Sequence, residues 1–136
     1  MESRVANEWS RYIGRAEQAF RASTLLLEGR FYEDAISKAY YAMLYASSAL
    51  LAKYRIRRKK HSAVIAAIGQ YFVKPGHLST QIHRNFINVF EDRETADYNV
   101  TWQATERDAG LHLKHAREFI DVVKSLLKKD LKIKQI

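Results

Sequence analysis

Apolar residues recur at helical spacing through residues 29–51, and we expect this segment to be the central element of the fold. Five alanines at steps of three or four form one stripe on a helix: Ala35, Ala39, Ala42, Ala46 and Ala49. A stripe of methyl groups lets a neighbouring helix approach closely, because no large side chain holds the two backbones apart. Aromatic and aliphatic residues widen the apolar surface around this stripe. The pattern predicts a helix that is buried on most of its sides.

A second long helix is expected from about residue 3 to residue 28, with its apolar residues on one face. Gly29 suits the left-handed conformation that often ends a helix. Only Arg30 and Phe31 then connect this helix to the central one. Because the connection is so short, the two helices are expected to run antiparallel.

The second half of the chain predicts two short helices and one long one. Ser62 and Ser79 are the expected N-caps of the short helices, which we interpret as one helical arm with a bend. Residues 91–101 show no apolar period and predict a loop. Asn99 or Thr101 is expected to cap the last long helix. The basic tail from about residue 128 is expected to fray.

Length and composition agree with a single all-α domain, residues 1–136, folded as an up-and-down bundle of four to five helices. The chain has no cysteine, so a disulfide framework and a thiolate metal site are excluded. We expect no metal and no cofactor. No apolar run approaches the roughly 18 residues of a membrane helix, and no secretory signal is evident, so we expect a cytoplasmic protein without membrane contact.

Positive charge is unevenly placed along the chain. The net charge is +8, and residues 53–60 hold six positive charges and no negative one. Such a patch favours a polyanionic partner, nucleic acid above all. The candidate nucleic-acid-binding residues are Arg55, Arg57, Arg58, Lys59, Lys60 and His61. The alternative is a solvated surface that keeps the protein soluble.

Three stretches, in this order and at this spacing, carry a resemblance to a known family. They are residues 29–42, with the pattern Gly-x-Phe-Tyr-x-x-Ala followed by Ser-Lys-Ala-Tyr-Tyr-Ala; residues 61–76, with His-Ser-Ala-Val and then Phe-Val-Lys-Pro-Gly; and residues 93–98, with Arg-x-x-Ala-Asp-Tyr. The arrangement resembles the HEPN domains (higher eukaryotes and prokaryotes nucleotide-binding), in particular their small stand-alone prokaryotic branch. The resemblance covers nearly the whole chain.

The resemblance implies a HEPN-like helical bundle that forms a homodimer and pairs with a small nucleotidyltransferase protein, as toxin and antitoxin. The alanine stripe and the segment around Arg93 are the candidate dimer interfaces. In catalytic members of the family an Arg, four to six residues and then a His form a metal-independent endoribonuclease site. An arginine binds the scissile phosphate as a planar donor, and a histidine exchanges the proton of the 2′-hydroxyl.

This chain departs from that motif, because Arg93 is followed by four residues and then by Tyr98 instead of a histidine. A phenol, with an ordinary pKa of about 10, is a poor base at neutral pH. Asp97 is a possible but weak proton acceptor. In paired systems of this family a tyrosine near the motif can accept a nucleotidyl group from the partner, which gives Tyr98 another role. Alternatively, Arg93, Asp97 and Tyr98 only pin the segment to the bundle.

Three hypotheses stay open, and the enzyme question stays open with them. The first is a HEPN-type module that binds RNA or a nucleotide as one half of a pair with a minimal nucleotidyltransferase. The second is an endoribonuclease toxin in which Arg93 holds the phosphate and Asp97, Tyr98 or a histidine such as His61 acts as base. The third is a non-catalytic helical interaction protein.

Overall fold

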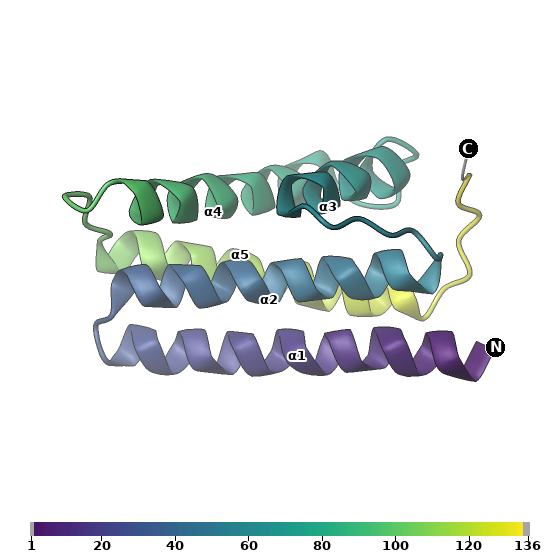
Figure 1. Cartoon of the computed structure of the whole chain (residues 1–136), viewed down its shortest axis with the longest axis horizontal. Helices are drawn as coiled ribbons and strands as arrows, with labels where there is room; N and C mark the ends of the chain where they lie inside the picture. Colours follow the sequence, from purple (N-terminus) through teal and green to yellow (C-terminus); the bar gives the residue numbers. More distant parts are fainter. Residues whose placement is uncertain (1, 135–136) are drawn as a thin grey trace.

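The computed structural model, described for residues 2–134 with side chains from residue 7 onward, is an all-α bundle (Figure 1). In chain order its elements are α1 (Glu2–Glu28), α2 (Tyr32–Lys53), α3 (His61–Ile68), the π-helical turn η1 (Gly69–Val73), α4 (Thr80–Tyr98) and α5 (Glu106–Leu127). The predicted fold class is confirmed. Residues 1, 135 and 136 of the expected domain lie outside the described residues. Among the helices described, none has the length and apolar character needed to cross a membrane.

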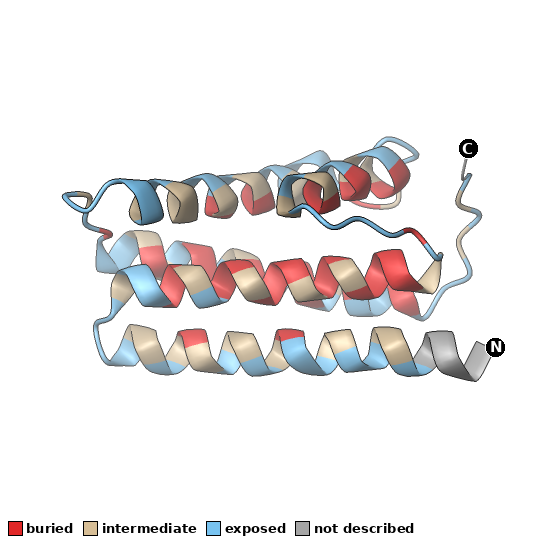
Figure 2. Cartoon of the chain, in the orientation of Figure 1, coloured by how far each residue is buried: buried red, intermediate tan, exposed pale blue. Residues whose placement is uncertain are grey.

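Helix α2 is the centre of the bundle, as the sequence predicts. It packs against α1, α3, α4 and α5, and buried residues run along its whole length (Figure 2). All five alanines of the stripe are completely buried in the core. Since α1 and the other helices already cover them, these alanines are not a free dimer interface, and that part of the expectation is wrong.

The turn between α1 and α2 confirms the antiparallel pair but not the role expected of Gly29. The left-handed residue is Arg30, with φ of 67°. Phe31 donates its backbone N–H to Leu26 and Arg30 donates to Leu27, which is the hydrogen-bond pattern of a Schellman motif. A Cβ at Gly29 would lie 3.0 Å from the ring of Phe31. Gly29 therefore serves the close approach of that ring, and its neighbour adopts the strained backbone.

The two short helices form an antiparallel hairpin and not one bent arm. His83 Nε2 of α4 lies 2.9 Å from the carbonyl oxygen of Ile65 in α3, eighteen positions earlier in the chain. The Ser79 hydroxyl caps α4 as expected, at 3.0 Å from the Ile82 N–H. Ser62 does not cap α3, because that helix already begins at His61 and its N-cap is Lys60, without a side-chain cap.

Helix α4 extends through most of the segment for which a loop was expected. It ends at Tyr98. The N-cap of α5 is Thr105, and not Asn99 or Thr101 as expected. Thr105 forms a capping box with Asp108. The loop prediction for residues 91–98 is wrong because polar residues there make the contacts that apolar ones make elsewhere. Arg93 packs on tyrosines of α2, and Asp92 bonds to α5.

Residues 128–134 follow α5 without helical structure. Lys53 at the end of α2 donates to the carbonyl oxygens of Leu127 and Lys129 at 2.8 and 2.6 Å. The Leu131 N–H donates to the Tyr54 hydroxyl at 3.0 Å. The start of the tail is thus held against the end of α2, and fraying of the tail stays a prediction.

Candidate functional site

Arg93 lies on the last turns of α4, against the middle of α2. Its guanidinium carbon is 5.1 Å from the ring centroids of both Tyr40 and Tyr41. Nη2 donates a hydrogen bond to the Tyr41 hydroxyl at 3.1 Å and lies 3.4 Å from a carboxylate oxygen of Asp97. Glu94 is farther away, at 3.8 Å. The arginine is therefore oriented by two phenol rings and only partly neutralised by carboxylates.

Two features of this arginine differ from those of an ordinary surface arginine. Its side chain is only 18% exposed. Its Nε is buried and has no hydrogen-bond partner within the described part of the chain. A buried donor without a partner is costly, and such a group needs an explanation such as a water or a ligand. The described residues leave this donor of Arg93 unsatisfied, as they do three other buried polar atoms.

His61 reaches the same two rings from a third element. It is the first residue of α3, and its ring centroid is 5.8 Å from that of Tyr40 and 6.0 Å from that of Tyr41. The basic linker after α2 carries His61 back along the bundle to this position (Figure 1). Arg93 and His61 therefore converge on one pair of tyrosines. We call this group of Tyr40, Tyr41, His61, Arg93 and Asp97 the Arg93 site.

The two phenols of the site have different roles. Tyr40 is fully buried, and burial raises its pKa far above the usual range for a phenol. It therefore stays neutral and acts as a platform. Tyr41 is half-buried and accepts the hydrogen bond from Arg93. Imidazole is the side-chain type that exchanges protons most readily near neutral pH. Within the Arg93 site this makes His61 the group suited to proton transfer.

The structure separates the three residues that the sequence grouped together. Asp97 contacts Arg93 one helical turn away and is about half exposed. Tyr98 is the last residue of α4 and is 84% exposed. Among the described residues, no hydrogen bond, ion pair or ring contact joins Tyr98 to Arg93. Tyr98 is therefore an open hydroxyl near the site but not a member of it.

The basic linker is divided between structural and open cations. Arg55 has φ of 59° and ends α2 as Arg30 ends α1. Arg57 forms a bidentate pair with Glu8 of α1, with 3.0 Å between Nη2 and Oε2. The hydrogen bond from Arg57 lowers the pKa of Glu8. Arg58 and the two lysines that follow it are exposed. Positive charge without a carboxylate partner among the described residues is therefore carried by Arg55 and by residues 58–60, which lead to His61.

A half-buried polar pair that the sequence did not reveal links α4 to α5. His112 is buried, and its Nε2 lies 2.6 Å from a carboxylate oxygen of Asp92. His112 is thus bound within the fold. Burial lowers the pKa of His115, and the nearby His112 lowers it further. Across the described residues, no three His, Asp or Glu side chains group as a metal site.

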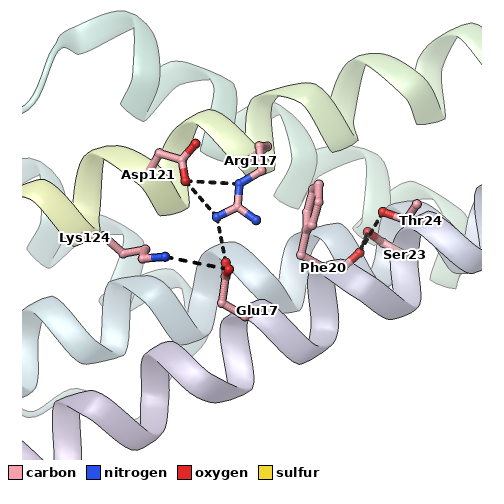
Figure 3. Close-up of polar contacts among 7 residues, drawn as sticks. All are labelled: Glu17, Phe20, Ser23, Thr24, Arg117, Asp121 and Lys124. Carbon is pink, nitrogen blue, oxygen red and sulfur yellow. Dashed lines mark hydrogen bonds and ion pairs between the residues drawn. The ribbon is translucent and has the colours of Figure 1, made fainter.

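Arg117 of α5 is a second arginine between helices (Figure 3). Its Nη2 lies 2.7 Å from Glu17 of α1 and 2.8 Å from Asp121, and its guanidinium carbon is 4.8 Å from the ring centroid of Phe20. Lys124 adds a weaker contact to Glu17 at 3.8 Å. Burial alone lowers the pKa of Arg117, but the hydrogen bonds to Glu17 and Asp121 outweigh it and raise that pKa. Through Nε and Nη2 this arginine holds α1 to α5.

Comparison with known proteins agrees with this architecture. The profile of the HEPN domain matches residues 9–126. The chain belongs to the HEPN domain family. This HEPN chain is also 32% identical over 127 residues, 93% of the chain and 86% of the relative, to a Methanocaldococcus jannaschii protein named "Putative toxin MJ0142". A second protein of that organism, "Putative toxin MJ0605", is 34% identical over 127 residues, 93% of this chain and 94% of its own length.

Further relatives extend the similarity to bacteria and to a solved structure. A UPF0332 protein of Thermotoga maritima is 30% identical over 131 residues, 96% of each chain. The crystal structure of ST0689, described as an archaeal HEPN homologue, superimposes with a TM-score of 0.72 over 88% of this chain and 98% of that chain. At 19% identity, that structure supports the fold alone. The resemblance stated from the sequence is confirmed.

Proposed function

We propose that this HEPN protein is an RNA-binding module of the toxin type whose Arg93 site holds a phosphate of the RNA. The observation that carries the proposal is the convergence of Arg93 and His61, from different helices, on the rings of Tyr40 and Tyr41. A guanidinium held by aromatic faces, with donors left over, is suited to bidentate binding of phosphate. The relatives named as toxins support the same class of function.

The surroundings of the site favour an anion as well. The exposed cations from Arg58 to Lys60 lead directly into His61. Asp97 is the nearest acidic group to Arg93, and it is half exposed, so it is free to move away from an incoming phosphate. We expect binding to be dominated by such contacts and therefore to weaken strongly as salt is raised.

Binding of labelled single-stranded RNA at low salt, followed by fluorescence anisotropy, tests this proposal. Arg93→Ala should weaken the affinity by about tenfold to a hundredfold, because it removes charge-assisted hydrogen bonds to the phosphate. Arg84→Ala removes the same charge from an exposed position of the same helix and should change the affinity by less than about twofold. Equal losses in the two variants would leave only non-specific attraction, and no binding by the wild type would contradict the proposal.

Metal-independent RNA cleavage is a second candidate, favoured by the position of His61. In this reaction His61 takes the proton of a 2′-hydroxyl, whose oxygen attacks the adjacent phosphorus. The bond from phosphorus to the 5′-oxygen breaks, that oxygen takes up a proton, and a 2′,3′-cyclic phosphate remains. Arg93 stabilises the charge that develops on the phosphate. His61→Asn should abolish cleavage and leave binding nearly intact, whereas cleavage that survives this variant would exclude His61 as the base.

We also propose that two copies pair and that the protein functions with a small nucleotidyltransferase. Two of the large apolar side chains that are exposed, Phe31 and Val100, lie in the connections at one end of the bundle (Figure 1). Phe31→Asp with Val100→Asp should convert a dimer to a monomer in analytical ultracentrifugation. If the double variant is still a dimer, the interface lies elsewhere. If the wild type is a monomer, the proposal that two copies pair is wrong.

Tyr98 provides the test of the nucleotidyltransferase partnership. Its exposed hydroxyl would attack the α-phosphorus of a nucleoside triphosphate bound by the partner, with pyrophosphate as the leaving group. Incubation with the product of an adjacent nucleotidyltransferase gene should add one nucleotidyl mass to the wild type and none to Tyr98→Phe. If neither this modification nor RNA binding is detected, the non-catalytic interaction protein is the hypothesis that survives.

A further inference from the structure

A groove lies between α1 and α2, outside the Arg93 site. It encloses about 390 Å³ and is lined by Arg15, Gln18, Ala19, Ala22, Lys38 and Tyr45. No carboxylate is among these lining residues. The volume falls within the range of small-ligand sites, about 300–1,000 Å³.

The cations of the groove are not neutralised by the fold. Arg15 and Lys38 are exposed, and neither forms an ion pair with a carboxylate among the side chains that the structure describes. Arg15 instead lies over the ring of Tyr45, with 5.3 Å from its guanidinium carbon to the centroid, and is 3.4 Å from the Tyr45 hydroxyl. Two acidic residues of α1 are engaged elsewhere, since Glu17 bonds to Arg117 and Glu8 to Arg57.

The groove is continuous with the Arg93 site along α2. The ring centroids of Tyr45 and Tyr41 are 6.4 Å apart, and Arg93 lies over Tyr41 at 5.1 Å. Lys38, Tyr41 and Tyr45 recur at steps of three and four, so they share one face of the helix. A path therefore runs from the cation of Arg15, over the neighbouring rings of Tyr45 and Tyr41, to the cation of Arg93.

Aromatic rings flanked by cations suit single-stranded nucleic acid, because bases stack on the rings and phosphates meet the cations. We propose that the α1–α2 groove binds the nucleotides of a single-stranded RNA that neighbour the phosphate held at Arg93. The groove is thus a second subsite of one binding path. This inference rests on the proposed function, since it assumes that RNA occupies the Arg93 site.

Affinity measured against RNA length tests the second subsite. An oligonucleotide of about eight nucleotides spans both sites, whereas one of about three reaches only the Arg93 site. Arg15→Ala combined with Lys38→Ala should weaken binding of the longer RNA by about tenfold and leave binding of the shorter RNA unchanged. Because two phosphate contacts are lost, the slope of log affinity against log salt should fall by about 1.4 for the longer RNA.

A matched control separates this subsite from general charge. Arg84→Ala combined with Lys114→Ala removes two exposed cations from α4 and α5 and should leave both affinity and salt slope unchanged. If the wild type binds no RNA, the proposed function fails. If Arg93→Ala weakens both RNAs while the Arg15 and Lys38 variant behaves as the wild type, only the second subsite fails. Equal effects of the two double variants would also overturn it.

Substitution of Tyr45 distinguishes stacking from charge. Tyr45→Phe keeps the ring and should retain the affinity for the longer RNA, whereas Tyr45→Leu removes it and should weaken that affinity by about fivefold. Circular dichroism of both variants checks that the fold is kept. Equal binding by folded Phe and Leu variants would show that no base stacks in the groove, and the subsite as proposed would be wrong.

Discussion

Arg93 and Arg117 both lie between helices and both pack on aromatic rings, yet their surroundings differ in one respect. Arg117 meets Glu17 and Asp121 at 2.7 and 2.8 Å, and its ring partner is a phenylalanine. Arg93 meets a phenol at 3.1 Å and a half-exposed carboxylate at 3.4 Å, and one of its nitrogens is buried without a partner. The carboxylates therefore hold Arg117 more closely than they hold Arg93.

The comparison shows why burial alone does not identify a functional arginine. A guanidinium closed between two carboxylates has its charge neutralised, so it contributes to packing and not to recognition. Arg93 is oriented by phenol rings and meets its two carboxylates only at 3.4 and 3.8 Å, so its charge is less closely neutralised. The nearby histidine strengthens the assignment, because His61 adds an imidazole to the two rings that hold Arg93.

The largest expected difference between the two arginines is in stability. Arg117→Met leaves Glu17 and Asp121 without their partner and should lower the free energy of unfolding by about 1–2 kcal/mol. Arg93→Met places an apolar side chain between Tyr40 and Tyr41 and removes the unpaired Nε, so its effect should stay within about 0.5 kcal/mol. Urea denaturation of both variants measures this, and a greater loss for Arg93 would contradict the distinction.

A smaller effect is expected from the carboxylate beside each arginine. Asp97→Asn removes the charge that competes with a phosphate for Arg93 and should raise RNA affinity about two- to threefold. Asp121→Asn, its counterpart at Arg117, should leave RNA affinity unchanged. Anisotropy titrations at constant salt compare the two. Weaker RNA binding by Asp97→Asn would show that the carboxylate assists the ligand.

The smallest effect on stability is expected at Arg57, which is paired with one carboxylate, that of Glu8, on the surface of the bundle. The hydrogen bond from Arg57 lowers the pKa of Glu8 in the folded protein. The ion pair therefore stabilises the fold at pH values above the pKa of Glu8 in the unfolded chain, near 4.5. This stabilisation is lost as the pH falls through the lower pKa that Glu8 has in the folded protein. Glu8→Gln should cost less than about 0.5 kcal/mol at neutral pH, and its unfolding free energy should meet that of the wild type at the acid end.

Freeing Arg57 should also affect the ligand. In Glu8→Gln this arginine joins the open cations of the linker, so RNA affinity at neutral pH should rise by less than about twofold. If the stability difference between Glu8→Gln and the wild type did not change with pH, the pair would not be formed in solution.

The sequence predicted the scaffold because the scaffold depends on local pattern. The alanine stripe, the short α1–α2 connection and the Ser79 cap each fix one part of the bundle from neighbouring residues alone. The end of α4 was missed because Arg93 packs there as apolar residues do elsewhere, so apolar periodicity gave no sign of it. The Thr105–Asp108 capping box is a sequence pattern that would have placed the start of α5 correctly.

The site was only half predictable for a different reason. Arg93 and Asp97 are neighbours on one helix, and their pairing follows from a spacing of four. The position of His61 beside these rings depends on the path that the linker takes after Arg55 in the folded bundle, which local sequence patterns do not predict. The groove did leave a sign, since Lys38, Tyr41 and Tyr45 form a polar face on an otherwise apolar helix. Such a break in a buried helix indicates an exposed functional face.

The most direct measurement is a nuclear magnetic resonance titration that follows the arginine Nε–H signals as a short single-stranded RNA is added. The Nε of Arg93 is buried, so its proton should exchange slowly enough to be observed. We predict that the Arg93 signal shifts with the RNA concentration while the Arg117 signal stays in place. A stationary Arg93 signal beside shifting signals from other arginines would contradict the central claim that the unsatisfied arginine is the one that binds RNA.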